Sequence, residues 1–387
     1  MIINKLITNN LLVVTFLILS FHSLSLNAEN LSYITPTHIQ SVTDPYEHYN
    51  DINPSWSSDG KIISYERFDA TNHEIVLVDQ KGERIKFVST KSNDEDDLAL
   101  LLPELDSTPY FAFNISWASD NKQYIFVSNG SSDNFDLYQG NTIDKEPKRI
   151  THHESIDNQA QWSPSSAQVV FVSSRDNKAN LYLFDISTKK PTSLLSLTED
   201  AINPVWSPDG KKIAFMLGKG NIFQIYVIDD IKNANESIRQ LTDLTFYNNI
   251  RPSWSPDGSK IAFFTLQTKN NEDQQWDIAV VNSALAQPVT DANISRHIVS
   301  SNVIQNSLKG PSWIPDNKHI AYVQYIDDLY NPIHLVNVNN KHQALIITNT
   351  KMNRDVSCSS TGTLVFQSQD EQWSRIFTAK LPGFEDK

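Results

Sequence analysis

PVWSPDGKKIAFM, residues 204–216, contains a short stretch that predicts a tight turn. Ser207 can hydrogen-bond back to the chain at the first turn position, Pro208 fixes φ at the second, and Gly210 suits the left-handed conformation at the fourth. The apolar run KKIAFM that follows is typical of a strand. The stretch therefore predicts a β-hairpin: a strand, a type I turn and a second strand.

The same unit recurs along the chain, with a Trp just before the turn. Its other copies are PSWSSDGKIISYE from Pro54, ISWASDNKQYIFV from Ile115, AQWSPSSAQVVFV from Ala160, PSWSPDGSKIAFF from Pro252, PSWIPDNKHIAYV from Pro311 and the degenerate VSCSSTGTLVFQS from Val356. The anchoring residues are Trp56, Trp117, Trp162, Trp206, Trp254, Trp313 and Cys358, at intervals of 61, 45, 44, 48, 59 and 45 residues. Intervals of this size are expected of propeller blades.

The intervals hold further strand-like segments. A third strand is indicated by EIVLVD (74–79), NLYLFDI (180–186), IYVIDD (225–230), DIAVV (277–281) and IHLVNV (333–338). A fourth is indicated by RIKFVS, PKRIT, SIRQLT, AQPVT and ALIIT. Four short strands per repeat predict an all-β fold, a seven-bladed β-propeller of four-stranded antiparallel blades.

The two ends of the chain complement each other. The last repeat has strands near 363–367 and 375–381 and then stops without an outer strand, whereas THIQSVTD (37–44) has the outer-strand pattern but precedes the first repeat. We therefore expect residues near 38–43 to complete the last blade and close the ring, which removes exposed sheet edges.

The N-terminus has the pattern of a secretion signal. The apolar run LLVVTFLILSF (11–21) follows Lys5 and precedes SLSLNA, which is typical of a signal peptide cleaved after about Ala28. An uncleaved anchor is the alternative, although the run is short for a bilayer span. We expect a signal peptide (1–28), a short N-terminal segment (29–36), a single propeller domain (37–382) and a C-terminal tail (383–387). The expected location is periplasmic or secreted, with no integral membrane segment after cleavage.

Composition excludes several classes of function. The formal net charge of −13 repels polyanions, so nucleic acid is not an expected partner. Cys358 is the sole cysteine, which excludes an intramolecular disulfide, and we expect it to be a small core residue. The chain has no G-x-S-x-G, H-E-x-x-H or phosphate-binding Gly-rich motif. We therefore expect no cofactor, no catalytic residue and no metal site, and we expect a monomer.

The W-S-P-D-G repeat followed by an I-A-F strand resembles the repeats of the TolB-like propellers over about residues 37–381. The resemblance implies the fold and not one function, because such repeats also occur in peptidase accessory domains and in oligogalacturonate lyases. The namesake of the family carries an α/β domain ahead of a six-bladed ring. This chain has seven repeats and about ten residues between the cleavage point and the closing strand. We therefore favour a related periplasmic binding role over the same role as the namesake of the family.

Loops on one face of the predicted propeller are the expected binding surface. This face holds the connections between second and third strands and between blades, around the mouth of the central channel. Two insertions, Lys91–Phe113 and Asp291–Leu308, lengthen it, and the second includes Arg296 and His297. They are either solvated loops that cap blade edges or a ligand-binding rim.

A column of residues three positions before each anchor is predicted to lie near the channel mouth. It consists of Asn53, Asn114, Gln159, Asn203, Arg251, Gly310 and Asp355. We expect the amides to hydrogen-bond loop backbone or ordered water. Arg251, Lys309 and Arg354 predict a cationic arc that would suit a carboxylate or phosphate. The alternative is that Arg354 pairs with Asp355 or other local acids and that all three offset the negative surface.

These observations favour a non-catalytic propeller that binds a protein or peptide partner in the cell envelope through its loop-rich face. An anionic ligand at the channel mouth is a further expectation. The candidate binding residues are Arg251, Lys309, Arg354, Asn53, Asn114, Asn203, Asp355, Arg296 and His297. The alternative is a carbohydrate-active propeller such as an oligogalacturonate-lyase-like enzyme, in which the arc would neutralise sugar carboxylates. A metal held by His residues on the loop-rich face would favour the lyase.

Overall fold

The computed structural model describes residues 32–44, 46–47, 49–68, 72–88, 110–130, 134–143, 146–220, 222–268, 275–306, 308–369 and 372–384. Tyr33–Lys387 forms one compact unit, and Met1–Ser32 forms a second unit of which only Ser32 is described. The predicted signal peptide, nearly all of the insertion 91–113 and the last three residues lie outside the described residues. Within the described part, no helix is long and apolar enough to cross a membrane.

The hairpin predicted from residues 204–216 is present. Strands β15 (Asp200–Trp206) and β16 (Ile213–Lys219) pair antiparallel, with Trp206 opposite Ile213. In the turn between them, Gly210 N donates to Ser207 O over 2.9 Å, and Gly210 has a φ of 69°. Ser207 Oγ donates to Asp209 Oδ1 over 2.6 Å, which fixes the turn from inside.

The strands of the compact unit form four-stranded antiparallel sheets, some of which are joined at their edges. Three of these sheets are separate, and the first consists of β11 (Asp157–Trp162), β12 (Gln168–Ser173), β13 (Asn180–Asp185) and β14 (Lys190–Ser193). The second consists of β15, β16, β17 (Ile222–Ile228) and β18 (Ile238–Gln240). The third consists of β29 (Met352–Cys358), β30 (Thr363–Gln369), β31 (Ser374–Lys380) and β2 (His38–Ser41). Two other sheets are joined at their edges. One consists of β3 (Asn50–Trp56), β4 (Ile62–Phe68), β5 (Asn72–Asp79) and β6 (Arg84–Val88), and the other of β7 (Tyr110–Trp117), β8 (Gln123–Ser128), β9 (Asp136–Asn141) and β10 (Lys148–Arg149). Strands β5 and β7 join the two sheets by pairing in parallel.

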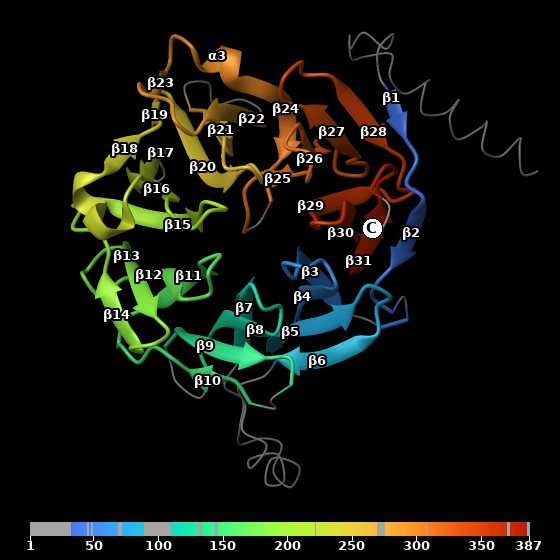
Figure 1. Cartoon of the computed structure of the whole chain (residues 1–387). Helices are drawn as coiled ribbons and strands as arrows, with labels where there is room; N and C mark the ends of the chain where they lie inside the picture. Colours follow the sequence, from blue (N-terminus) through green and yellow to red (C-terminus); the bar gives the residue numbers. More distant parts are fainter. Residues whose placement is uncertain are drawn as a thin grey trace, which may run out of the picture. The chain divides into compact units, whose positions relative to one another are not determined.

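Nine of the remaining strands form one continuous sheet. Its path runs through β20 (Tyr247–Trp254), β21 (Lys260–Gln267), β22 (Trp276–Asn282), β24 (Ile298–Ile304), β26 (His319–Gln324), β27 (Ile333–Asn337), β28 (Gln343–Ile346) and β1 (Ser32–Ile34), with β25 (Ser312–Trp313) paired to β26. A 3-10 helix, η2 (Ile231–Glu236), follows β17, and β19 (Thr242–Asp243) pairs in parallel with β23 (Val289–Thr290). In Figure 1 the sheets lie around a common centre, with β3, β7, β11, β15, β20, β25 and β29 nearest to it.

The N-terminal and C-terminal segments of the unit share one sheet. Strand β2 pairs antiparallel with β31, with His38 opposite Lys380 and Ser41 opposite Phe377. Val42 N also donates to Ile376 O over 2.8 Å. The segment predicted to be an outer strand therefore lies beside the last strand of the chain.

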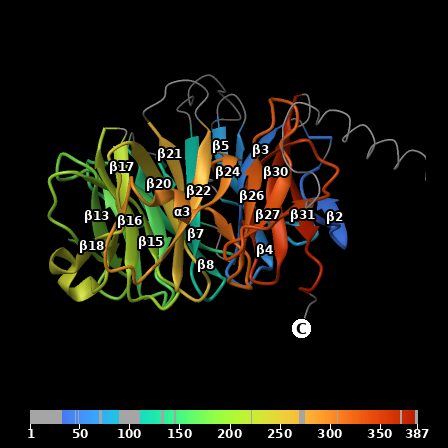
Figure 2. The same ribbon diagram turned by 90° about the horizontal axis from the view of Figure 1, so that it is seen from above.

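The core lies between neighbouring sheets. Val170 and Leu181 of one sheet share a buried cluster with Trp206 and Phe215 of the next, and the same pattern continues along the chain. Val365 and Ile376 of the last sheet share such a cluster with Trp56 and Ile63 of the first. Each sheet therefore buries its apolar side chains against its neighbours. Figure 2 shows that the strands run between two opposite faces of the unit.

The insertion Asp291–Leu308, predicted to be a loop, is mostly regular structure. It contains the short helix α3 (Ile294–His297) and the strand β24, which pairs with β22 on one side and β26 on the other. Two valines of this strand, Val299 and Val303, are buried. The predicted fourth strand, AQPVT, is correspondingly displaced from β22 and pairs as β23 with β19.

Candidate functional site

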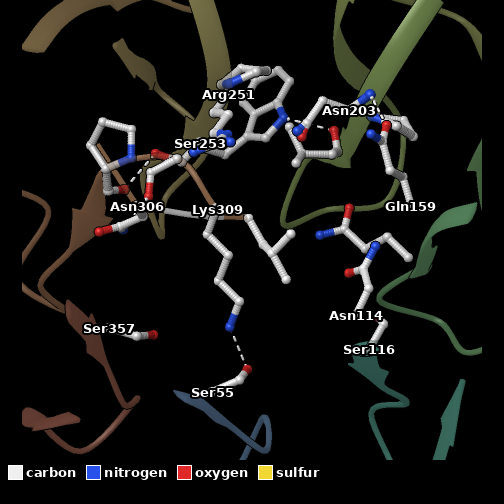
Figure 3. Close-up of a pocket in the computed structure, with 18 of the residues that line it drawn as sticks. Ser55, Asn114, Ser116, Gln159, Asn203, Arg251, Ser253, Asn306, Lys309 and Ser357 are labelled. Atoms are coloured by element: carbon white, nitrogen blue, oxygen red, sulfur yellow. Dashed lines mark hydrogen bonds between the residues drawn. The ribbon is translucent and has the colours of Figure 1, made fainter. Parts of the chain in front are cut away.

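The first strands of the sheets enclose an axial pocket of about 770 Å³. These inner strands are β3, β7, β11, β15, β20, β25 and β29, and Figure 3 shows side chains from several of them around the space. The lining extends from Phe223 and Asn248, where strands begin, to Ser58 and Pro208 in the turns at the opposite ends. A pocket of this volume is within the range of ligand-binding cavities.

Most of the predicted column lies in the middle of the inner strands, at β-bulges. Each bulge shifts the register of an inner strand against its neighbour, for example between Ile202 and Val205. The bulge residues have left-handed φ values of 52°, 59°, 48°, 56°, 53° and 50° at Asn53, Asn114, Gln159, Asn203, Arg251 and Asp355. Asn tolerates this conformation better than most residues. The column was therefore placed too close to the channel mouth, and backbone geometry explains its Asn residues.

Side chains of the preceding sheet accept hydrogen bonds from these bulges. Asn203 N donates to Gln159 Oε1 over 2.7 Å, and Arg251 N lies 3.2 Å from Met216 Sδ. Such contacts stabilise neighbouring sheets against each other, since a bulge leaves backbone N–H groups outside the ladder.

Glu66 accepts hydrogen bonds from the bulges of the first two sheets. From the sequence it was not identified as a candidate residue. Its Oε1 accepts from Asn114 N over 3.0 Å, and its Oε2 accepts from Asn53 Nδ2 over 2.8 Å. His73 Nε2 lies 3.0 Å from the same Oε2. Glu66 is buried, so these partners replace water around the carboxylate. Its only signal in the sequence was an acid within a predicted strand.

Arg251 lines the pocket without a partner for its guanidinium. Neither a hydrogen bond nor an ion pair joins that group to another described residue, and Nη1 is buried. Desolvation lowers the pKa of Arg251, and the charge of Asp355 partly opposes this. The side chain is therefore a cation that the described protein leaves without an acceptor.

Lys309 lines the same pocket, but its ammonium group does not lie beside the Arg251 guanidinium. In Figure 3 the side chain extends away from Arg251 and donates a hydrogen bond to Ser55 Oγ. Desolvation lowers the pKa of Lys309 to about 8, with Asp355 and Glu66 opposing the shift. The two cations share one pocket and do not converge on one point, so the predicted arc becomes two separate cationic positions.

The other predicted site residues are distributed differently. Arg354 is exposed and does not line the pocket, while Asp355 is buried and acts electrostatically on both cations. Asn114 and Asn203 line the pocket, whereas Asn53 is turned to Glu66. Arg296 and His297 belong to α3, which lies at the outer edge in Figure 1. His297 Nδ1 lies 3.3 Å from Val280 O there.

The charge of the pocket lining differs from that of the whole chain. The chain contains 45 acidic and 32 basic residues. Among the described residues that line the pocket, Arg251 and Lys309 carry charge, and no Asp or Glu is present. Asn, Gln and Ser side chains supply the other polar groups, at Ser55, Ser58, Asn114, Ser116, Gln159, Gln161, Asn203, Asn248, Ser253, Gln305, Asn306, Ser312 and Ser357.

The ends of the sheets where the inner strands begin are called the loop face here. Phe68, the last residue of β4, pairs with Asn50, the first of β3, and both are therefore remote from the turn at Ser57–Gly60. Large exposed apolar residues occur on this face at Tyr46, Tyr49, Phe68, Phe111, Ile156, Ile222, Phe246 and Leu329. Ile143 lies at the opposite end, because Asn141 pairs with Gln123 next to a turn.

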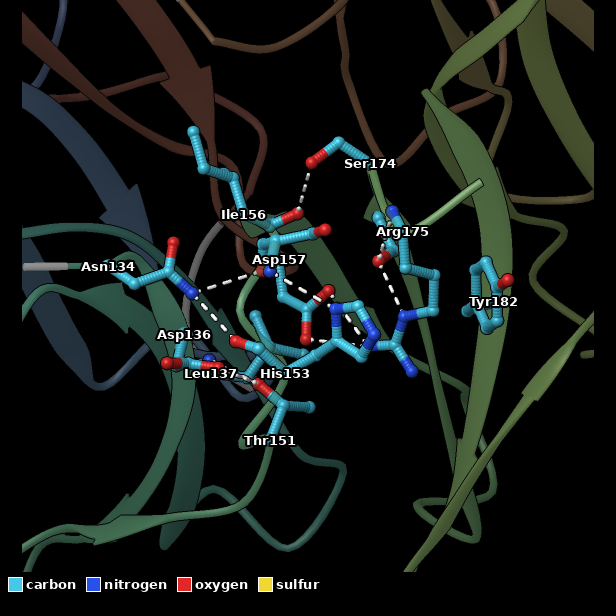
Figure 4. Close-up of polar contacts among 12 residues, drawn as sticks. Asn134, Asp136, Leu137, Thr151, His153, Ile156, Asp157, Ser174, Arg175 and Tyr182 are labelled. Atoms are coloured by element: carbon cyan, nitrogen blue, oxygen red, sulfur yellow. Dashed lines mark hydrogen bonds and ion pairs between the residues drawn. The ribbon is translucent and has the colours of Figure 1, made fainter. Parts of the chain in front are cut away.

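Buried ion pairs hold the loop face in place. Arg175 donates to both oxygens of the fully buried Asp157, over 2.9 and 2.8 Å, and Arg67 binds Asp51 in the corresponding place of the first sheet. Figure 4 shows Asn134 next to this pair, donating to His153 O over 2.8 Å. These contacts fix the connection between β10 and β11, so this part of the face is a preformed surface. Among the residues described, no group of three or more His, Cys, Asp or Glu could hold a metal ion.

The structural comparisons agree on the fold. Putative TolB from Agrobacterium tumefaciens is 19% identical, with 75% of this chain and 97% of that chain covered and a TM-score of 0.51. Oligogalacturonate lyase from Vibrio parahaemolyticus is 13% identical, with 92% and 97% covered and a TM-score of 0.59. TolB from Acinetobacter baumannii is 17% identical over 74% of this chain, with a TM-score of 0.49, and this chain spans 63% of its length. At these identities, the likeness to the Agrobacterium and Vibrio structures is one of fold.

A family model provides the assignment. No curated protein sequence matches the chain. The model described as TolB beta propeller domain matches residues 103–271 and 162–383, which together span most of the chain. The chain therefore belongs to the TolB beta-propeller domain family.

Proposed function

We propose that the protein is a non-catalytic, periplasmic or secreted propeller of seven blades that binds a protein or peptide through its loop face. Seven repeats, the pairing of β2 with β31, and the cluster that joins the last sheet to the first all support a ring closed by the N-terminal strand. The signal-like run at residues 11–21 supports export. A rigid ring would present the loop face as one continuous recognition surface.

The distribution of exposed apolar side chains is the observation that carries this proposal. Phe68, Phe111, Ile222, Phe246 and Leu329 are exposed by 37%, 37%, 48%, 41% and 73%, and all belong to the loop face. Single exposed apolar residues are ordinary, but residues of this kind gathered on one face are typical of protein recognition. Phe68 and Phe111 also contact His73, at ring-centroid distances of 5.9 and 6.5 Å, so they form part of a cluster.

In-cell photo-crosslinking tests the proposal. A photoactivatable amino acid at position 246, on the loop face, is expected to give a discrete adduct with a protein of the envelope. The same amino acid at position 143, on the opposite face, is the matched control and is expected to give none. Equal adducts from both positions, or none from the loop face, would contradict the proposal.

A second pair of variants asks whether the apolar side chains contribute. The double variant Phe68→Ser, Phe111→Ser is expected to weaken the adduct formed at position 246. The control Phe87→Ser removes a similarly exposed ring from the outer strand β6 and is expected to leave the adduct unchanged. Turnover of oligogalacturonate on addition of manganese, with no adduct from either face, would favour the lyase alternative.

A further inference from the structure

We propose that the axial pocket is a binding site for an acidic peptide segment, with Arg251 and Lys309 as separate contacts for its carboxylates. This inference rests on the proposed function, because the segment would belong to the partner that docks on the loop face. The pocket lining reaches Phe223 and Asn248 at the strand ends on that face, so a segment entering from there would meet both cations.

The charge of the lining is the first argument. Acidic residues outnumber basic ones in the chain by 45 to 32, yet the described lining has two cations and no carboxylate. Walls of protein around a narrow space strengthen the field of such charges, because water screens them less. The pocket therefore favours an anion in a protein whose surface as a whole repels one.

Arg251 supplies the second argument, because its backbone does not favour Arg. The corresponding bulges carry Asn at residues 53, 114 and 203, which suits a left-handed φ. Arg251 has a φ of 53° and a guanidinium with no acceptor among the described residues. Arg is therefore unfavourable here for two reasons: the left-handed φ, and a buried donor without an acceptor. A residue that is unfavourable for folding in this way is typical of a binding position.

Lys309 supplies the second contact. Its neighbour Gly310 packs closely on the inner strand β20, because an added Cβ would lie 2.3 Å from Arg251 O. This contact fixes the chain from which the Lys309 side chain extends. The ammonium reaches Ser55, and no ion pair joins it to a described residue. Two cations at different points suit an extended ligand with more than one carboxylate. The amide and hydroxyl groups between them suit a peptide backbone.

The tryptophans argue against a sugar ligand. Recognition of oligosaccharides generally uses aromatic faces that are open to the ligand. Trp56, Trp117, Trp162, Trp206 and Trp313 border the inner strands but are only 5–8% exposed. Trp254, which also lines the pocket, is partly buried, and its Nε1 donates to Val205 O over 3.1 Å. Their rings contribute to the contacts between sheets and leave little surface for stacking.

Calorimetric titration of the full mature chain with two tetrapeptides tests the inference. The probes are acetyl-Asp-Ser-Gly-Asp with a free C-terminus and its neutral counterpart acetyl-Asn-Ser-Gly-Asn-amide, at constant ionic strength and pH 7. The acidic peptide is expected to bind at least tenfold more tightly. Arg251→Asn and Lys309→Met are each expected to weaken its binding about tenfold. Arg354→Asn removes an exposed charge outside the pocket and is the matched control, expected to have no effect.

A pH series with the wild-type protein avoids any concern over folding of the variants. The charged groups that act on Lys309 are Asp355 and Glu66. Because the pKa of Lys309 is about 8, raising the pH from 7 to 9.5 is expected to weaken binding of the acidic peptide several-fold. Unchanged affinity at pH 9.5 would remove Lys309 from the site.

Several outcomes would overturn the inference. They are equal binding of the two peptides, no binding of either, an equal loss in Arg354→Asn, or tighter binding of inorganic phosphate or trigalacturonate. Any of these together with the loop-face adduct at position 246 would end the pocket proposal and leave the proposed function standing. Tight, Arg251-dependent peptide binding without an adduct would instead count against the loop face alone.

Discussion

Replacement of Arg251 by Asn is expected to stabilise the folded protein while it weakens anion binding. Left-handed φ costs an ordinary residue about 1–2 kcal/mol, and Asn avoids much of this cost. The substitution also removes a guanidinium whose Nη1 is buried without an acceptor among the described residues. Loss of the packed aliphatic stem offsets part of the gain. We therefore expect the free energy of unfolding to rise by about 1–2 kcal/mol.

The corresponding change in melting temperature follows from the size of the domain. Unfolding entropy is about 2.1 cal/mol/K per residue, which gives about 0.7 kcal/mol/K for about 350 residues. The expected shift is therefore about +1.5 to +3 °C, measured by differential scanning calorimetry in a buffer without polyvalent anions.

A reciprocal variant provides the control. Asn203 occupies the same position in another sheet, with a φ of 56°, and lines the same pocket. Asn203→Arg is expected to lower the melting temperature by a similar amount, because it places Arg where the backbone favours Asn. The reasoning would be refuted if Arg251→Asn lowered the melting temperature. That result would mean that Arg251 stabilises the folded protein and is not kept there for a ligand.

Other residues give independent tests of the fold and its electrostatics. Gly310→Ala is expected to cost about 3 kcal/mol of stability, because its Cβ would lie 2.3 Å from Arg251 O. Gly220→Ala, where an added Cβ would meet no other described residue within 4 Å and φ is 65°, is expected to cost only about 1 kcal/mol, and chemical denaturation compares the two variants. Glu66→Ala should cost about 3 kcal/mol by the same measurement, since it leaves buried donors without an acceptor; a loss equal to that of Gly220→Ala would contradict this. Burial raises the pKa of Cys358 to about 12, so alkylation of the folded protein at pH 8 should be at least 100-fold slower than that of the unfolded chain. Because the pKa is raised in the folded state, the thiol contributes its full stabilisation below about pH 9 and loses it as the pH rises towards 12. Rapid alkylation of the folded protein would show that Cys358 is not buried in this way.

Local sequence determined much of the architecture. The turn at residues 207–210 follows from Ser, Pro and Gly at fixed positions, and the repetition of that unit predicted the sheets that follow one another along the chain. The pattern of residues 37–44 was enough to place β2 beside the C-terminal strands, because outer strands share a common motif. Each of these features depends on contacts close in sequence or on a repeated pattern, so one sequence is sufficient to find them.

The site depended on contacts that no repeat pattern records. The sequence grouped Arg251, Lys309 and Arg354 because they begin successive repeats, but the structure separated them: Arg251 and Lys309 line the pocket, and Arg354 does not. It treated Asp291–Leu308 as a loop, although this segment gains the hydrogen bonds of a strand from β22, which precedes it in the chain, and from β26, which follows it. Glu66 became visible only when the first two sheets were packed together. By itself, the sequence determined the repeating unit and the order of the sheets, because turns and strand periodicity are local. The tertiary structure decided which polar side chains meet in the axial pocket, because that depends on how separate sheets pack around a shared centre.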